Sequence, residues 1–296
     1  MMRSPSRMAV AVRRGDGSIA MLERPFISIT RRFRVLGWPF LRGAVSLFEA
    51  LYLGVTALQF SADEAAKDEA GQPGPGGPLA AVLQTLTIVV AFGLGILLFV
   101  VLPAKITAWL GFHDRIEFGL VDGFFRLVAF VIYLVLVSQW KELARVLGFH
   151  GAEHKAIHAL ENGAPLTPES VQTFSRFHPR CGTSFLFLVV VVSIVAFTFI
   201  GKPRGLGDHL LRIACMPVIV GVAFEFIRLS GKYADRPLVK GLIWPGMQFQ
   251  RLTTREPDLT MCAVAIEALE RVRSDEAVVR LTAAGEQARA EVAFIQ

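Results

Sequence analysis

The chain has 296 residues, of which 53% are hydrophobic and only 19% are charged, and its mean hydropathy is +0.50. Because the apolar residues also come in blocks, the composition excludes an ordinary soluble domain and predicts an integral membrane protein. The net charge of +6 comes from basic residues that crowd beside the apolar blocks. That placement is typical of membrane orientation, so we expect no nucleic-acid partner. The three widely spaced cysteines imply no disulfide framework and fit a reducing compartment.

The N-terminal segment, residues 1–39, is basic and contains a predicted β-hairpin over residues 8–23. Two apolar runs there flank Arg14-Gly-Asp-Gly17, and Asp-Gly is a strong turn signal. Residues 40–60 are apolar but carry polar side chains at spacings of three, four and seven, which place them in one helical stripe. A stripe that contains Arg42 and Glu49 predicts an interfacial amphipathic helix. We expect a flexible linker over residues 61–81, which is acidic and rich in Gly and Pro.

Residues 82–229 are predicted to form the membrane domain. Four apolar stretches there approach the ~20 residues that a helix needs to cross a bilayer: Val82–Leu102, Phe118–Gln139, Ser184–Ile200 and Leu210–Leu229. Lys and Arg concentrate in the N-terminal segment, in loop 140–183 and in tail 230–296. Four spans place all three of these segments on the cytoplasmic side, whereas a fifth span at 40–60 would separate the N-terminus from the tail.

The predicted fold class is therefore an all-α integral membrane protein of the inner (cytoplasmic) membrane. It has four transmembrane helices, an interfacial amphipathic helix, a small N-terminal β-hairpin and a cytoplasmic helical tail, with both termini in the cytoplasm. In loop 140–183 we expect the second span to continue to a break at Gly148, then a helix over 151–161 and a short one from Thr167 to about Phe177. In the tail, residues 230–257 read as loop, Ala263–Val272 as helix, and a further helix is expected from about Asp275.

Two polar motifs in loop 140–183 carry candidate chemistry. The first holds His150, His154 and His158, which share one face of a helix because they are four residues apart. The second is His178-Pro-Arg-Cys181-Gly. Imidazole and thiolate are the commonest ligands of zinc, so the two motifs together predict a metal site. A helix face whose histidines form hydrogen bonds at the membrane interface is the alternative reading.

The order His150-x-x-Glu153-His154 is that of the inverted zincin signature. In that signature two imidazoles one turn apart chelate the metal, and the carboxylate handles a proton of the bound water. We predict a divalent metal, zinc, with Glu153 as the general base and His150, His154, His178 and Cys181 as candidate ligands. Four ligands would form a closed structural site and three ligands plus water a catalytic one, and the sequence leaves both open.

We expect the two motifs to meet in space. They lie near the ends of the second and third predicted spans, which enter and leave on the same side. The intervening chain reads as two short helices separated by Asn162-Gly-Ala-Pro165, so its ends can return close together. Buried charges are also expected to pair within their own helices, Asp122 with Arg126 and Glu225 with Arg228.

Three longer stretches carry a family resemblance: Phe149-His-Gly-Ala-Glu-His-Lys, Ser175-Arg-Phe-His-Pro-Arg-Cys-Gly-Thr-Ser-Phe185 and Gln250-Arg-Leu-Thr-Thr-Arg-Glu-Pro257. With Met1-Met-Arg-Ser-Pro5 and Phe40-Leu-Arg-Gly43, they resemble the bacterial membrane family called domain of unknown function 1385. Members are labelled predicted metal-dependent enzymes, so the resemblance implies one site with Glu153 among its residues. The family usually carries a Gly-Gly-Gln-Ala-Val-Ile-Glu-Gly-Val-type segment before Met-Met-Arg, which suggests that this chain begins late or is trimmed.

The leading hypothesis for function is a membrane-embedded metal-dependent enzyme, a hydrolase acting at the cytoplasmic face. One alternative is a membrane scaffold or assembly factor in which the same residues form a structural zinc site. Another is a transporter or channel with a polar path lined by Asp122, Arg126, Glu225 and Arg228. The expected partners are the lipid bilayer and, as an open alternative, further copies of the chain in a homo-oligomer.

Overall fold

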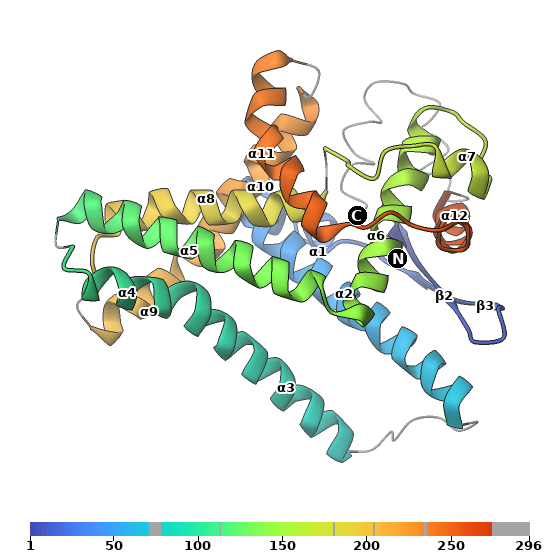
Figure 1. Ribbon diagram of the computed structural model, residues 1–296, viewed down its shortest axis with the longest axis horizontal. Helices are drawn as coiled ribbons and strands as arrows, with labels where there is room; N and C mark the ends of the chain where they lie inside the picture. Colours follow the sequence, from blue (N-terminus) through green and yellow to red (C-terminus); the bar gives the residue numbers. More distant parts are fainter. Residues whose placement is uncertain (71–77, 113, 180, 204, 234–235, 274–296) are drawn as a thin grey trace.

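The computed structural model describes residues 1–70, 78–112, 114–179, 181–203, 205–233 and 236–273. Long helices fill one part of the molecule, and the N-terminal sheet lies with α6, α7 and α12 at the opposite end from the α4–α5 and α8–α9 connections (Figure 1). In the described part of the chain five helical stretches are long and apolar enough to cross a membrane: Leu41–Lys67, Thr85–Trp109, Arg115–Ser138, Gly182–Ile200 and Leu206–Ser230. The prediction of a mostly helical chain with several apolar helices of membrane-spanning length and a small N-terminal β-structure is confirmed.

The apolar stretches predicted as spans all form helices, and two of them differ in detail. The first runs through α3 (Pro78–Ile96), a π-helical turn (Leu97–Val101) and α4 (Leu102–Trp109), beyond its predicted end. The last is divided into α9 (Leu206–Ala214) and α10 (Met216–Lys232). The division falls at Cys215 because proline at position 217 lacks the N–H that a continuous helix needs.

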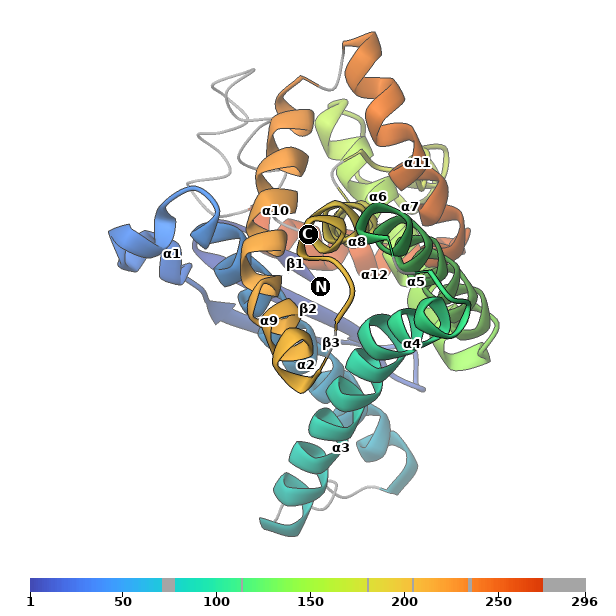
Figure 2. The same ribbon diagram turned by 90° about the vertical axis from the view of Figure 1, so that its left-hand side faces the viewer.

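Close packing of α5 (Arg115–Ser138) on α8 (Gly182–Ile200) depends on glycine. A Cβ atom on Gly119 would lie 2.5 Å from Thr198 Cα, and one on Gly123 would lie 2.4 Å from Ile194 Cγ2. Figure 2 looks along these two helices and shows α10 and α11 on either side of α8. These glycine contacts lie at the start of α5 and the end of α8, and they set the close approach of the two helices that bound loop 140–183.

The predicted hairpin is confirmed and gains a third strand. Strands β1 (Met2–Arg3), β2 (Arg7–Arg13) and β3 (Ile19–Pro25) form an antiparallel sheet in that order. The turn uses Gly17 at φ +87°, a conformation that favours glycine, and Asp16 Oδ1 accepts a hydrogen bond from Ser18 N at 2.8 Å.

Helix α2 (Leu41–Ala70) is longer than the predicted interfacial helix. The linker expected over residues 61–81 is wrong for residues 61–70, which end α2, and for residues 78–81, which begin α3. Residues 63–70 are rich in the strong helix formers Ala, Glu and Lys. Residues 71–77 lie outside the described chain. The N-terminal part also includes α1 (Ile29–Arg32) and a 3-10 turn (Arg34–Gly37).

The N-terminal sheet and the turn after it lie along α2 over much of its length. Buried Glu49 accepts hydrogen bonds from Ser28 Oγ at 3.0 Å and from the Ile29 backbone N–H at 2.6 Å. Further along α2, Leu53 is buried in a cluster with residues of β2. Near the end of the helix, buried Glu64 forms an ion pair with Arg14 at 2.6 Å.

The polar loop contains α6 (Lys141–Glu161) and α7 (Pro168–Gln172), and the tail contains α11 (Pro237–Thr253) and α12 (Leu259–Arg273). The predicted break at Gly148 is wrong, because the chain turns earlier, at Gln139 and Trp140, and then runs as one helix. α7 ends at Gln172 rather than near Phe177. The stretch 230–257, predicted as loop, is largely α11, whereas α12 confirms the predicted tail helix. The helix expected from Asp275 lies outside the described residues.

The buried charges pair between helices as well as within them. Asp122 forms the predicted ion pair with Arg126 at 3.0 Å and a second one with Arg212 of α9 at 3.4 Å. Glu225 pairs with Arg42 of α2, whose Nε donates to Glu225 Oε1 at 2.7 Å. The predicted self-pairing of Glu225 with Arg228 was therefore wrong as the principal contact, because α2 packs directly on α10.

Candidate metal centre

One face of α6 carries His150, His154 and His158, as their spacing predicted. His154 is fully buried, and the His150 and His154 rings lie 4.5 Å apart between centroids. The α6 helix is fixed here by the apolar residues of its other faces, which form a common core with α12, α7 and the sheet: Ala152, Ala156, Ile157 and Ala159. The histidine face is thereby turned toward the chain segments that bear the second motif.

Each of these three imidazoles donates a hydrogen bond to a backbone carbonyl. His150 Nδ1 binds Thr253 O at 2.8 Å, and His154 Nδ1 binds Arg176 O at 2.6 Å. His158 Nε2 binds Phe177 O at 2.9 Å. A carbonyl can only accept, so each contact fixes which ring nitrogen carries the bonded N–H and directs the second ring nitrogen away from that carbonyl, where it can bind a metal in its deprotonated form. This is the outer-shell arrangement typical of metal-ligating histidines.

The second motif meets this face through Cys181. Cys181 is the N-cap residue of α8, where its Sγ accepts from Thr183 N at 3.4 Å. The same sulfur lies 3.4 Å from His150 Nε2. One donor atom from each of His150, His154 and Cys181 lies within 4.8 Å of the others. We call these three residues the His/Cys cluster, and the two motifs meet in space through Cys181.

His150 and Cys181 form a charged pair. Burial alone would lower the pKa of His150, but the hydrogen bond and charge of Cys181 raise it to about 9. Burial likewise opposes ionisation of the thiol, yet the contacts with His150 and His154 lower the pKa of Cys181 well below its ordinary value. The thiolate is the form of cysteine that binds metals, so the cluster holds its sulfur in the ligating state.

His178 lies in a neighbouring group rather than inside the His/Cys cluster. Donor atoms of His158, Glu161 and His178 lie within 4.8 Å of one another, with His178 Nε2 3.4 Å from Glu161 Oε2. The His178 ring is 4.6 Å from that of His158 and 5.9 Å from that of His154, between centroids. The predicted ligands therefore converge in one place but divide into two adjacent sets of donors.

Glu153, the predicted general base, is half-buried on the same helix. Its carboxylate contacts the amino nitrogen of Met1, and its negative charge contributes to the raised pKa of His150. The Glu153 oxygens belong to neither group of converging donor atoms among the described residues. Its role stays a prediction.

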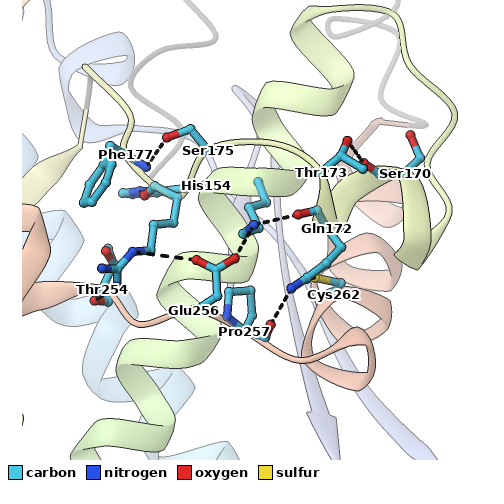
Figure 3. Close-up of polar contacts among 12 residues, drawn as sticks. His154, Ser170, Gln172, Thr173, Ser175, Phe177, Thr254, Glu256, Pro257 and Cys262 are labelled. Carbon is cyan, nitrogen blue, oxygen red and sulfur yellow. Dashed lines mark hydrogen bonds and ion pairs between the residues drawn. The ribbon is translucent and has the colours of Figure 1, made fainter.

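The carbonyls that orient the histidines belong to two segments that bind each other and α6 (Figure 3). Arg176 donates to Thr254 O at 2.5 Å, and Gln172 Nε2 donates to Pro257 O at 2.9 Å. Lys155 of α6 joins both segments, since its Nζ lies 2.7 Å from Gln172 O and 2.5 Å from Glu256 Oε1. The two segments whose carbonyls orient the histidines are thus held to each other and to α6 by side-chain hydrogen bonds and an ion pair.

The side chain of Gln250 in α11 binds both the backbone of His178 in the second motif and Ser184 of α8. Its side-chain amide accepts from His178 N at 2.8 Å and donates to His178 O at 2.7 Å and to Ser184 Oγ at 3.0 Å. Sequence reasoning did not assign Gln250 or Glu161 to the site, and it placed His158 on the histidine face without counting it among the candidate ligands. The resemblance had marked residues 250–257, and Glu161 follows His158 at the one-turn spacing i, i+3, so both signals were available.

The donors present fit a zinc-type ion. His154 Nε2 is buried and has no hydrogen-bond partner within the described chain, which is costly for a polar atom that nothing ligates. Two imidazoles and one thiolate form a ligand set suited to zinc. The low-pKa thiol supplies the thiolate that this ion requires, and the carbonyl contacts orient the two rings, of which His150 must release a proton when a metal binds.

Comparison with known proteins places the chain in a family. A family model described as Protein of unknown function (DUF1385) matches residues 38–275, a range that contains every candidate metal-binding residue. The uncharacterized protein YqhQ of Bacillus subtilis (strain 168) is 31% identical over 278 residues, which cover 90% of this chain and 87% of that protein. No solved structure matches. The chain therefore belongs to the family described as Protein of unknown function (DUF1385).

Proposed function

We propose that the protein is a metal-dependent membrane enzyme, a hydrolase that acts at the cytoplasmic face. The observation that carries this proposal is the His/Cys cluster, in which two carbonyl-oriented imidazoles and a thiolate converge and one buried imidazole nitrogen lacks a partner. A set of three protein donors is typical of catalytic zinc sites, which keep a further position open.

The topology that we propose has four membrane spans, with α2 lying at the interface and both termini in the cytoplasm. The contacts of Glu49, Leu53 and Glu64 with the N-terminal sheet and with the turn after it support this proposal. The N-terminal sheet and the turn after it contact α2 from Glu49 to Glu64. If α2 crossed the bilayer, this N-terminal part would have to enter the bilayer with it. The basic N-terminal segment, loop and tail then lie on one side, as the positive-inside rule requires.

The residues of the cluster have separable roles in this proposal. His150, His154 and Cys181 would hold a divalent metal, which when bound supplies a Lewis acid and lowers the pKa of a coordinated water. Glu153 would accept the proton of that water. His178 and Glu161, beside His154, form a second imidazole–carboxylate pair that can hold a proton next to the cluster.

The test combines elemental analysis with one isosteric substitution. The full chain, purified without chelators, should carry about one zinc per His/Cys cluster. Glu153→Gln should retain the metal and lose hydrolysis of a panel of ester, phosphoester and amide substrates, whereas Glu142→Gln, at an exposed position of the same helix, should retain both. A metal-free wild-type protein would overturn the proposal.

A structural zinc site is the second candidate, because the cluster joins α6, the start of α8 and the end of α11. In that case the protein would be a scaffold or assembly factor. Glu153→Gln would then leave every measured property unchanged, while Cys181→Ser would release the metal and expose loop 140–183 to protease.

A further inference from the structure

A pocket beside the candidate metal centre is lined by α11 and by the residues that flank His178. Its volume is about 410 Å³, within the range of small-molecule binding sites. Its lining residues, which we call the α11 pocket, are Phe177, Pro179, Lys240, Ile243, Trp244, Met247, Gln248 and Arg251. Residues 240, 244, 247 and 251 recur at spacings that place them on one face of α11.

The lining of the α11 pocket has a definite chemical character. Phe177, Pro179, Ile243, Trp244 and Met247 make its wall apolar, Lys240 and Arg251 are cationic, and none of the lining residues is acidic. Apolar surface with positive charge and no negative charge complements a ligand with a hydrophobic body and an anionic group.

The pocket is connected to the metal centre through the backbone of residues 177–179. Phe177 and Pro179 line the pocket, while the His178 side chain between them faces Glu161 and the His158 ring. Arg251 directly follows Gln250, whose amide holds the His178 backbone from both sides. An anionic group bound by Arg251 would therefore lie beside the second motif.

The pocket also lies beside helices that are apolar enough to cross a membrane. α11 runs across α8 rather than along it (Figure 1) and contacts its first turns, with the Phe249 and Phe187 rings stacked at 4.6 Å. Trp244 is 61% exposed, and tryptophan is enriched where a protein meets the membrane–water interface. If α8 crosses a membrane, α11 lies across its cytoplasmic end, and the face of α11 that carries Trp244 meets the lipid headgroups.

We propose that the α11 pocket binds an anionic phospholipid from the surrounding bilayer, and that this lipid class supplies the substrate of the neighbouring centre. The headgroup phosphate contacts Arg251 and Lys240, the glycerol region lies on Trp244 and Met247, and the acyl chains remain in the membrane. The substrate role rests on the proposed function, but binding of the lipid does not require the metal.

The experiment uses the full chain in vesicles, with Trp244 as the only tryptophan after Trp38, Trp109 and Trp140 are replaced by Phe. Fluorescence quenching is compared between brominated phosphatidylglycerol and brominated phosphatidylcholine at equal mole fraction, with and without chelator. We expect stronger quenching by phosphatidylglycerol. Lys240→Gln and Arg251→Gln should each reduce this preference about fivefold. Arg236→Gln, which removes a charge from the start of α11 outside the pocket, should not change it.

Three results would overturn the inference: equal quenching by the two lipids, a preference that survives the double Lys240→Gln/Arg251→Gln variant, or a preference that inorganic phosphate abolishes. The last result would assign the pocket to a soluble phosphate compound instead. A lipid preference that persists in the presence of chelator, in a protein that proves metal-free, would refute the proposed function alone. Loss of the preference in a zinc-containing protein would refute the lipid inference alone.

Discussion

At the scale of single residues, the imidazole of His150 links metal binding to pH. The neighbouring Cys181 thiolate raises the pKa of His150 to about 9, so this ring carries a proton at neutral pH when no metal is bound. A metal binds only the neutral ring and must displace that proton. Because the folded-state pKa is raised, the proton is held most firmly at low pH and is lost as the pH rises through about 9.

We therefore predict that zinc affinity rises about tenfold per pH unit from neutral pH toward the raised pKa and then levels off. Chelator-competition titrations over this range will measure the slope. Replacing Cys181 by Ser removes the charge that raises the pKa, so the residual affinity should become independent of pH above about 6.5, the ordinary value for His150. An affinity that does not change with pH in the wild-type protein would contradict the charged pair.

At the scale of elements, α6 and the segment after α11 fit together through a glycine. A Cβ atom on Gly151 would lie 2.2 Å from the backbone oxygen of Arg255, which cannot move without displacing Thr253 and its hydrogen bond to His150. A Cβ atom on Gly148 of the same helix would meet the Met261 sulfur at 2.8 Å, the flexible part of a side chain. The two positions form a matched pair.

Gly151→Ala should destabilise the fold by about 1–3 kcal/mol through overpacking and weaken zinc binding roughly 10-fold or more by disturbing an outer-shell contact. Gly148→Ala should retain zinc, because Met261 can adopt another rotamer and alanine is the better helix former. Thermal unfolding and zinc content of the two variants, in the same detergent, will show the difference. Equal behaviour of the pair would mean that residues 253–257 do not support the site.

The contrast between α6 and α11 shows what could be predicted from sequence. The four-residue spacing of His150, His154 and His158 fixes a shared helix face, so the side of α6 that bears the chemistry could be predicted. The carbonyl partners could not, because Thr253 and Arg176 reach the site through tertiary packing that leaves no local pattern. α11 was missed because Pro245 and Gly246 interrupt its sequence, yet packing on α8 stabilises the helix through them.

At the scale of the whole molecule, the packing of the N-terminal sheet against α12 constrains the topology. Met2 and Ala9 of the sheet share a core with Leu269 of α12 and Ala156 of α6, and this contact supports the proposed topology, in which the N-terminal segment, loop 140–183 and the tail lie on one side of the membrane. Sequence length and apolarity alone could not exclude α2 as a fifth crossing. The polar stripe that predicted an interfacial helix contains Glu49, and the Glu49 carboxylate accepts a hydrogen bond from the backbone N–H of Ile29.

We predict that single cysteines introduced at exposed Ser18 and Asn162 are protected from a membrane-impermeant maleimide in intact cells. A cysteine at exposed Gly205, where a side chain meets no atom within 4 Å, should be labelled. The parent chain with its three native cysteines sets the background. Labelling of Asn162→Cys from outside would reverse the orientation, and opposite results at Ser18 and Asn162 would make α2 a span.

The central claim is that the His/Cys cluster is a metal centre, and zinc X-ray absorption spectroscopy of the purified full chain tests it most directly. We predict one sulfur neighbour at ~2.3 Å and imidazole nitrogens at ~2.0–2.1 Å, with the sulfur contribution absent from Cys181→Ser. A spectrum with only nitrogen and oxygen neighbours, or one that Cys181→Ser leaves unchanged, would contradict the claim.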